Sequence, residues 1–129
     1  MIDEIKRNPK PNLNDIERIL FPIIDALHYL HVELKMTHRD IKPRNILLNS
    51  ERFPMLVDID SGKISQFSTK MQTVIGTLTY MAPEVRDAHL KGRGFSKINY
   101  FKADMFSVGI TMLHYIDSAK FKSLPFFEN

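Results

Sequence analysis

The sequence predicts an α+β fold that is mainly α, with two long helices and one short β-hairpin. Between residues 14 and 34, apolar side chains recur every three or four positions, which is the period of a helix with one buried face. From Met105 to Ile116 the chain is apolar on nearly all sides, which predicts a helix buried in a core. Two short apolar runs, Ile46–Leu48 and Met55–Val57, flank a polar, proline-containing segment and therefore predict paired strands.

Composition narrows the class of protein. The chain has 129 residues, the size of one small domain or of part of one. Its hydrophobic content of 43% is ample for a core, and a net charge of +3 gives no case for nucleic-acid binding. The absence of cysteine excludes disulfides, cysteine-based zinc sites and thiol nucleophiles. A polar start and no apolar run of membrane-spanning length predict no signal peptide, no membrane binding and an intracellular, cytoplasmic setting.

The N-terminal third is predicted to be helical. Residues 1–6 carry two isoleucines at helical spacing, and the proline-containing stretch Asn8–Asn12 then ends any helix. In the long helix that follows, Asn14 is the expected N-cap and Glu17 its capping-box partner. The expected buried face consists of eight apolar residues: Ile16, Ile19, Leu20, Ile23, Ile24, Leu27, Leu30 and Leu34.

Pro22 lies inside this predicted helix. A proline there removes one backbone hydrogen bond and clashes with the carbonyl of Arg18, which costs about 3 kcal/mol in a straight helix. We therefore expect a kink at Pro22 or a helix that restarts there. His28 and His31 are three residues apart, but no third ligand is evident, so we interpret them as ordinary helix histidines and not as a metal site.

The predicted hairpin brings two polar residues together. Its strands are joined by Asn49–Pro54, which is typical of a turn. Asn45 directly precedes the first strand and Asp58 directly follows the second, so both lie at neighbouring strand ends. Amide and carboxylate oxygens are ligands that Mg²⁺ accepts. The hairpin therefore predicts that both residues reach one metal–phosphate cluster.

The most informative stretch is Thr37–Leu48, which places Arg39, Asp40, Lys42 and the amide of Asn45 within seven residues. A carboxylate, an ammonium group and an amide, held on a loop beside a strand, suit chemistry on a polyanion. Asp40 can accept a proton from a hydroxyl, and Lys42 can neutralise charge on a phosphoryl group. Asn45 can offer its amide oxygen to Mg²⁺.

Three segments in the correct order resemble the eukaryotic protein kinase domain. The stretch from His38 to Asn45 has the residues and spacing of the H-R-D-x-x-x-x-N catalytic loop. Asp58 follows that asparagine by thirteen residues, as the aspartate of the Asp-Phe-Gly motif does in this family. The segment Gly76–Glu84 ends in Ala-Pro-Glu, as the corresponding family segment does. Lys42, two residues after Asp40, points to the serine/threonine type.

The resemblance implies a serine/threonine protein kinase that transfers the γ-phosphate of ATP to a protein hydroxyl, with ATP and Mg²⁺ as cofactors. It implies that Asp40 orients and deprotonates the substrate hydroxyl and that Lys42 stabilises the transferring phosphate. Thr77 is expected to hydrogen-bond to both and so to brace the loop. Asn45 and Asp58 are the expected magnesium ligands.

The resemblance also assigns the rest of the nucleotide site. Leu47 is expected to form the floor under the adenine, with Lys42 near the phosphates. Ile59 takes the place of the packing phenylalanine and keeps an apolar plug, whereas Asp60 replaces the glycine and adds a negative charge. A second register, Asp60-Ser61-Gly62, keeps the glycine but needs a two-residue insertion. The first register is favoured because it lets the second strand run unbroken to the aspartate.

Two further residues are assigned regulatory or structural roles by the resemblance. The hydroxyl-rich segment 61–74 resembles an activation loop, and Thr73 is the expected phosphosite, with Arg39 as the partner of its phosphate. A plain hydroxyl-rich loop is the alternative. Glu84 is expected to be a buried carboxylate whose family partner would lie beyond Asn129, which would leave it unpaired.

Asp104 stands where the family has an aspartate that holds the catalytic loop. It is therefore expected to hydrogen-bond to the backbone around His38 and Arg39. Without the family, Asp104 is expected as the N-cap of the apolar helix that follows it. The basic segment Arg86–Lys97 is expected to be a solvated loop, with a preference for acidic substrates as the alternative.

The implied fold is a protein-kinase-like C-lobe fragment whose hairpin carries the catalytic and metal-binding loops. Residues 1–129 correspond to a partial kinase domain, from the post-hinge helix to just past the central C-lobe helix, with the N-lobe and the last C-lobe helices absent. The expected partners are a protein substrate, ATP and a missing N-lobe or partner chain. The alternative is a non-catalytic kinase-like binding or scaffold fragment, or a truncated gene product.

Overall fold

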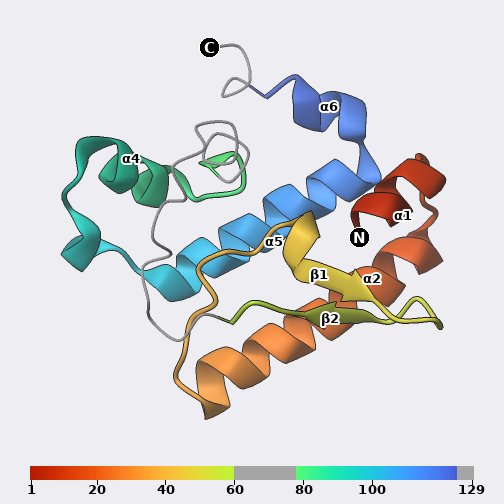
Figure 1. The fold of residues 1–129 in the computed structure, drawn as a ribbon, viewed down its shortest axis with the longest axis horizontal. Coiled ribbons are helices and arrows are strands. Elements are labelled where there is room, and N and C mark those ends of the chain that lie inside the picture. Colours follow the sequence, from red (N-terminus) through yellow and green to blue (C-terminus); the bar gives the residue numbers. More distant parts are fainter. Residues whose placement is uncertain (60–77, 125–129) are drawn as a thin grey trace.

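The computed structural model describes residues 1–59 and 78–124. Two long helices, α2 and α5, pack against each other, and a two-stranded hairpin packs against α2 (Figure 1). No helix in these two ranges is long and apolar enough to cross a membrane. The helices and strands, in chain order, are α1 (Ile2–Arg7), α2 (Leu13–His28), β1 (Ile46–Leu48), β2 (Pro54–Leu56), α4 (Pro83–Lys91), α5 (Tyr100–Ile116) and α6 (Ser118–Lys122).

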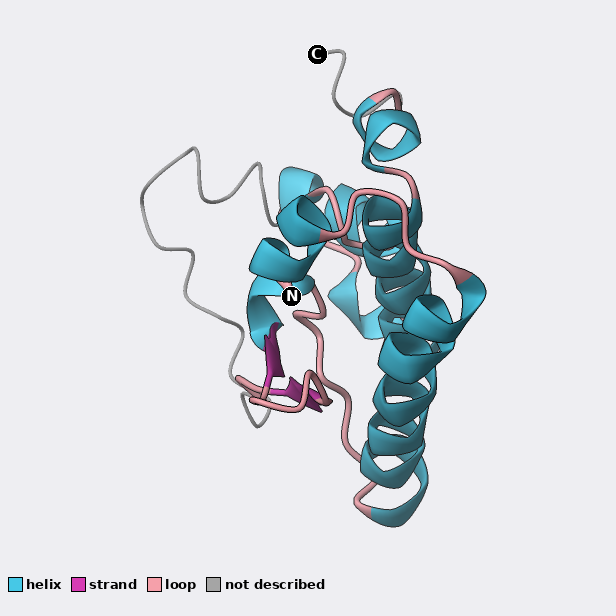
Figure 2. Cartoon of the chain, turned by 90° about the vertical axis from the view of Figure 1, so that its right-hand side faces the viewer, coloured by secondary structure: helices cyan, strands magenta, loops and turns pink. Residues whose placement is uncertain are grey.

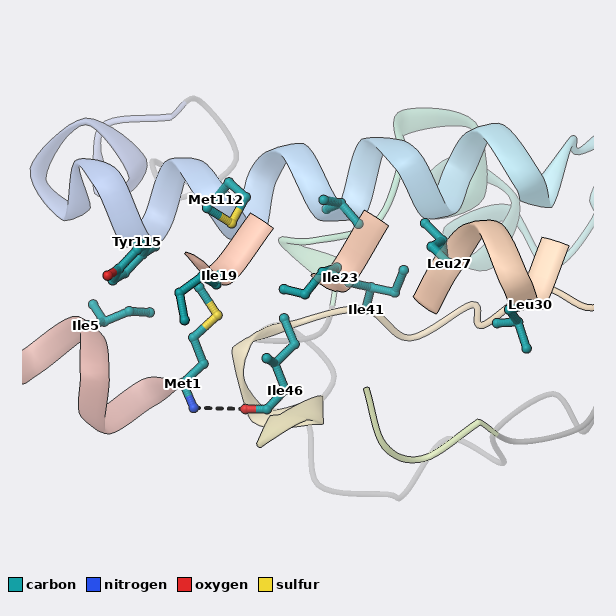
Figure 3. Packing of buried hydrophobic residues seen from close by; sticks show 11 residues of the cluster. Met1, Ile5, Ile19, Ile23, Leu27, Leu30, Ile41, Ile46, Met112 and Tyr115 are labelled. Carbon is teal, nitrogen blue, oxygen red and sulfur yellow. Dashed lines mark hydrogen bonds between the residues drawn. The ribbon is translucent and has the colours of Figure 1, made fainter. Parts of the chain in front are cut away.

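The main core lies between α2, α5 and the hairpin (Figure 3). One face of α2 is fully buried, and each such side chain contributes about 1.5–3 kcal/mol through the hydrophobic effect. The terminal amine of Met1 donates to the Ile46 oxygen at 2.8 Å and so joins α1 to β1 (Figure 3). The buried members of this core are Met1, Ile5, Ile19, Ile23, Leu27, Leu30, Ile41, Ile46, Val108, Met112 and Tyr115.

Helix α2 starts two residues earlier than predicted, at a different capping box. The Asn12 side chain accepts from the Asp15 N–H at 3.0 Å, and the Asp15 carboxylate accepts from the Asn12 N–H at 3.2 Å. The prediction of Asn14 and Glu17 is wrong, because the sequence offers two overlapping asparagine-and-acid pairs and the earlier one forms. The earlier start places Leu13 and Asn14 inside the first turn.

Pro22 does not restart the helix, because α2 is continuous from Leu13 to His28. Burial of the surrounding apolar residues offsets the hydrogen bond that the proline removes. After α2 the chain widens into a π-helical turn, Tyr29–Glu33, which changes the phase of the apolar pattern. Leu30, early in this turn, is still buried, whereas Leu34, predicted to join the same face, is 47% exposed.

The hairpin forms as predicted, with β2 one residue earlier than expected. The strands are antiparallel, and Leu47 faces Met55 across them. Both of these side chains lie on the outer face of the hairpin and are about half exposed. Ile46 and its partner Leu56 lie on the inner face, where Ile46 is buried and Leu56 packs against the core. This alternation is the two-residue period of a strand.

The segment before α5 is more ordered than predicted. Arg86–Lys97 was expected to be a loop, but α4 extends to Lys91 and ends at Gly92 in the left-handed region, with φ of 64°. The N-cap of α5 is Asn99, whose side chain accepts from the Lys102 N–H at 3.2 Å. Asp104 therefore lies inside the helix, and the N-cap prediction for it is wrong. Figure 2 shows the strands on one side of the helices.

Candidate active site

The side chains of Lys42 and Asn45 converge on the carboxylate of Asp40. The Lys42 Nζ lies 2.9 Å from the Asp40 Oδ2. The Asn45 Nδ2 donates to the same oxygen at 3.0 Å and to the Asp40 main-chain oxygen at 2.7 Å. The Asp40 side chain is 31% exposed and that of Lys42 16%, so the pair is partly shielded yet open to a substrate. The three residues predicted to be catalytic from the loop motif are therefore brought together.

The local sequence explains why these groups meet. Ile41 is buried in the core, and alternate side chains of an extended chain face opposite sides, so Asp40 and Lys42 both face outward. Pro43 then begins a 3₁₀ turn, where its missing N–H costs nothing. The turn is closed by a 2.9 Å hydrogen bond from the Asn45 N–H to the Lys42 oxygen, which returns Asn45 toward Asp40.

Asp104 anchors the backbone of this loop from inside α5. Its carboxylate accepts from the His38 N–H at 2.7 Å and from the Arg39 N–H at 2.8 Å. These are the hydrogen bonds expected for Asp104. Arg39 has a φ of 67°, in the left-handed region that side-chain-bearing residues rarely adopt, and the carboxylate holds it there. His31 lies on the other side of Asp104, with its Nε2 2.8 Å from Oδ2.

His38 joins the loop to the end of β2. Its Nε2 lies 2.9 Å from the Val57 oxygen, and its Nδ1 lies 3.3 Å from the Asp40 N–H. Because the amide can only donate and the carbonyl can only accept, the two contacts together assign the proton to Nε2. The ring is buried and therefore fixes the distance between the loop and the residues after β2.

Asn45 and Asp58 are adjacent across the hairpin, as predicted. The Val57 N–H donates to the Asn45 main-chain oxygen at 3.0 Å, and Asp58 is the next residue. Asp58 is exposed and has a φ of 62°, an outlier that is common near functional sites. With the Asn45 NH₂ group turned to Asp40, its oxygen is the atom left to act as a ligand.

Two structural expectations are wrong for the described residues. Ile59 is 44% exposed and does not form an apolar plug. Glu84 is exposed in the first turn of α4, where its negative charge interacts favourably with the positive end of the helix dipole, so it is not a buried unpaired carboxylate.

Leu47 is 49% exposed on the outer face of the hairpin. Asp60, Thr73 and Thr77, together with the alternative register, lie outside the described residues.

Sequence reasoning missed the contacts that fix Arg39 and Asp104 from a distance. His31, interpreted as an ordinary helix histidine, is bonded to Asp104, which lies 73 residues away. The Arg39 guanidinium lies 4.2 Å from the centre of the Tyr100 ring, and its Nε donates to the Thr37 Oγ1 at 2.9 Å. No local pattern signals such pairs. Within the described ranges no group of three or more His, Cys, Asp or Glu side chains could hold a metal ion.

A second polar contact lies near the start of α4. The Tyr80 hydroxyl and the His114 Nδ1 are 2.8 Å apart, and both rings stack on Phe121. Burial raises the pKa of the Tyr80 phenol to about 12, although the charge of Arg44 opposes this. Burial, assisted by the charge of Lys122, lowers the pKa of His114. Both shifts keep the pair neutral, with the hydroxyl as donor and the ring nitrogen as acceptor.

Comparison with known proteins assigns the family. Residues 2–126 match the protein kinase domain family. The chain belongs to the protein kinase family. It is 38% identical to dual specificity mitogen-activated protein kinase kinase 1 of Dictyostelium discoideum over 106 residues, covering 81% of this chain and 14% of that protein. It is 39% identical to serine/threonine-protein kinase hippo of Drosophila melanogaster over 115 residues, covering 87% and 16%.

A third relative is similar to this chain to the same extent. Serine/threonine-protein kinase cst-1 of Caenorhabditis elegans is 39% identical over 116 residues, which cover 87% of this chain and 21% of that kinase. The chain thus spans about a fifth or less of the length of these three relatives.

Proposed function

We propose that this chain is the catalytic-loop part of a serine/threonine protein kinase, which transfers the γ-phosphate of ATP to a hydroxyl of a protein substrate. The observation that carries the proposal is the convergence of Lys42 and Asn45 on the Asp40 carboxylate, in a loop whose backbone Asp104 holds. A rigid carboxylate beside a cation is what in-line transfer to a hydroxyl requires, because such transfer depends mainly on positioning and charge stabilisation.

In the proposed mechanism Asp40 orients the substrate hydroxyl and accepts its proton. Asn45 holds the carboxylate by donating to Oδ2, which fixes the direction in which its other oxygen can accept. Lys42, 2.9 Å from the carboxylate, stabilises the negative charge of the phosphoryl group during transfer. Thr77 remains the proposed brace of this pair, and Thr73 the proposed phosphosite that pairs with Arg39.

The residues present fit a magnesium ion. Asp58 presents an exposed carboxylate. Asn45 offers an amide oxygen, and its main-chain oxygen accepts a hydrogen bond from Val57, the residue before Asp58. Mg²⁺ is usually held by only one or two protein oxygens together with water and substrate phosphates, so a site with few protein ligands is sufficient. A bound Mg²⁺ would neutralise phosphate charge. We propose Asn45 and Asp58 as its ligands and the exposed Leu47 as the surface beneath the adenine of ATP.

A non-catalytic scaffold or binding fragment is the second candidate. It is supported by the exposed apolar side chains of Leu47, Met55 and Ile59, which lie on and beside the hairpin. Such a surface suits another protein element, either an N-lobe that completes the ATP site or a separate partner chain. The two candidates make different predictions for phosphate transfer.

The test uses the purified protein, with Mg·ATP and a protein substrate rich in serine and threonine. Phosphate transfer to serine or threonine is expected, and Asp40→Asn should reduce its rate by about 10²–10⁴-fold, because the variant cannot accept the proton. Asp3→Asn, an exposed change on α1, is the matched control and should leave the rate unchanged. No transfer by the unmodified protein, or full activity in Asp40→Asn, would contradict the kinase proposal and favour a scaffold.

A further inference from the structure

An open groove of about 710 Å³ lies beside the catalytic loop, between the turn that follows α2 and the start of α5. Its volume is in the range of ligand sites and far exceeds that of one phosphate group. It is separate from the Asp40 carboxylate, which is not part of its lining. The described residues that line it include Lys35, Thr37, Arg39, Lys97, Tyr100 and Phe101.

The charge of the groove is of one sign. Lys35, Arg39 and Lys97 line it, and none of its lining residues is acidic. All three cations are exposed, and within residues 1–59 and 78–124 neither lysine forms an ion pair. The nearby carboxylate of Asp104 is only 1% exposed and is already bonded to the loop backbone, so it offers little compensation.

The backbone holds two of these cations in an uncommon conformation. Lys35 has a φ of 53° and Arg39 a φ of 67°, which is the left-handed region where glycine is the residue without strain. The Arg39 guanidinium is fixed further by the Tyr100 ring at 4.2 Å and by the Thr37 hydroxyl at 2.9 Å. A pre-positioned arginine loses less conformational freedom when it binds an anion.

We propose that this groove binds an acidic peptide segment of a protein partner. The cations match carboxylates on the peptide, and Thr37, Ser96 and Asn99 can hydrogen-bond to its backbone. The apolar walls formed by Met36, Ile98 and the two aromatic rings suit a hydrophobic side chain between those carboxylates. A single phosphate would use neither these walls nor most of the volume. The proposal concerns recruitment and does not depend on phosphate transfer.

The experiment measures binding of a fluorescent peptide in which glutamates flank one phenylalanine and one leucine. Fluorescence anisotropy with the full-length protein, without nucleotide, is expected to show saturable binding that weakens with salt. Lys35→Glu with Lys97→Glu should weaken binding about tenfold or more, since two attractive charges become repulsive. Lys10→Glu with Lys120→Glu changes net charge equally at exposed lysines outside the groove and should bind like the unmodified protein.

A second variant separates binding from folding. Lys35→Gly removes one cation but suits the positive φ of that position, so binding should weaken by a few-fold while stability does not fall. The proposal is overturned if the peptide with glutamine for glutamate binds equally well, or if both groove variants bind normally. It is also overturned if inorganic phosphate displaces the peptide when both supply the same total negative charge. The same conclusion follows if phosphatidylserine vesicles bind the unmodified protein but not the groove variants, while the peptide does not bind.

Discussion

His38 and Asp104 lie 66 residues apart in the sequence, and the backbone N–H of His38 donates to the Asp104 Oδ2 at 2.7 Å. The same carboxylate accepts from the Arg39 N–H and lies 2.8 Å from the His31 ring nitrogen. One buried side chain of α5 therefore fixes the start of the loop that carries Asp40 and contacts the π-helical turn that follows α2. The positive φ of Arg39 is maintained by this long-range contact and not by local sequence preference.

Replacing Asp104 with alanine should destabilise the fold strongly. The change leaves the buried His38 N–H and the partly buried Arg39 N–H without an acceptor, and an unsatisfied buried donor costs about 1–3 kcal/mol. We expect the free energy of unfolding, measured by urea titration, to fall by about 2–5 kcal/mol. Asp87→Asn, which removes an exposed ion pair with Lys91, is the control and should cause no measurable change. An equal effect of both substitutions would show that Asp104 does not anchor the loop.

The capping box at the start of α2 can be tested by a matched pair of asparagines. Asn12→Ala removes the acceptor for the Asp15 N–H and should reduce the free energy of unfolding by about 0.5–2 kcal/mol. Asn14 is exposed in the first turn of the helix, so Asn14→Ala should change it by less than about 0.5 kcal/mol. The two alanine variants can be compared by thermal or urea unfolding. The reverse order would place the N-cap at Asn14.

The helices and the hairpin could be predicted because their signals are local. The apolar period of residues 16–30 and the two strand-like runs depend only on neighbours in the sequence. The site was predictable only through motif spacing, which located Asp40 and Asn45 without showing that they touch. Contacts such as His31 with Asp104 join segments that become adjacent after folding, so no sequence window contains them. The phase change that exposes Leu34 likewise follows from a π-helical turn with no clear local signal.

Stability is expected to fall in mildly acidic solution because of His114. Burial, with a contribution from Lys122, lowers the pKa of this histidine below its usual 6.5. Above about pH 6.5 His114 is neutral in both the folded and the unfolded chain, so its full contribution to stability is present. Below that pH the unfolded chain binds the proton more readily than the folded chain, so the free energy of unfolding decreases as the pH falls toward the lowered pKa. Urea midpoints between about pH 7 and pH 5 would measure this slope.

His114→Asn should make this slope shallower, because the Asn Oδ1 can still accept from the Tyr80 hydroxyl but does not titrate. The remaining slope should include His89, whose pKa burial also lowers, so the double variant with His89→Asn should be flatter still. An unchanged slope in the single variant would contradict the assignment.

At the alkaline end, the free energy of unfolding should fall between pH 10 and about 12, since burial raises the pKa of Tyr80.

Nucleotide binding gives the sharpest test of the half-site formed by Asn45 and Asp58. If these oxygens hold Mg²⁺ on the phosphates of ATP, Mg·ATP should raise the thermal midpoint, by an amount equivalent to about 2.7 kcal/mol when its concentration is one hundred times Kd. Asp58→Asn should abolish most of this shift, because the site loses its one carboxylate and its charge. Asp58 is exposed and forms no ion pair within residues 1–59 and 78–124, so the nucleotide-free midpoint should change little. A shift that persists in Asp58→Asn, or that needs no Mg²⁺, would mean that ATP binds without this residue, and the metal ligand would then have to be sought among the other carboxylates of the chain.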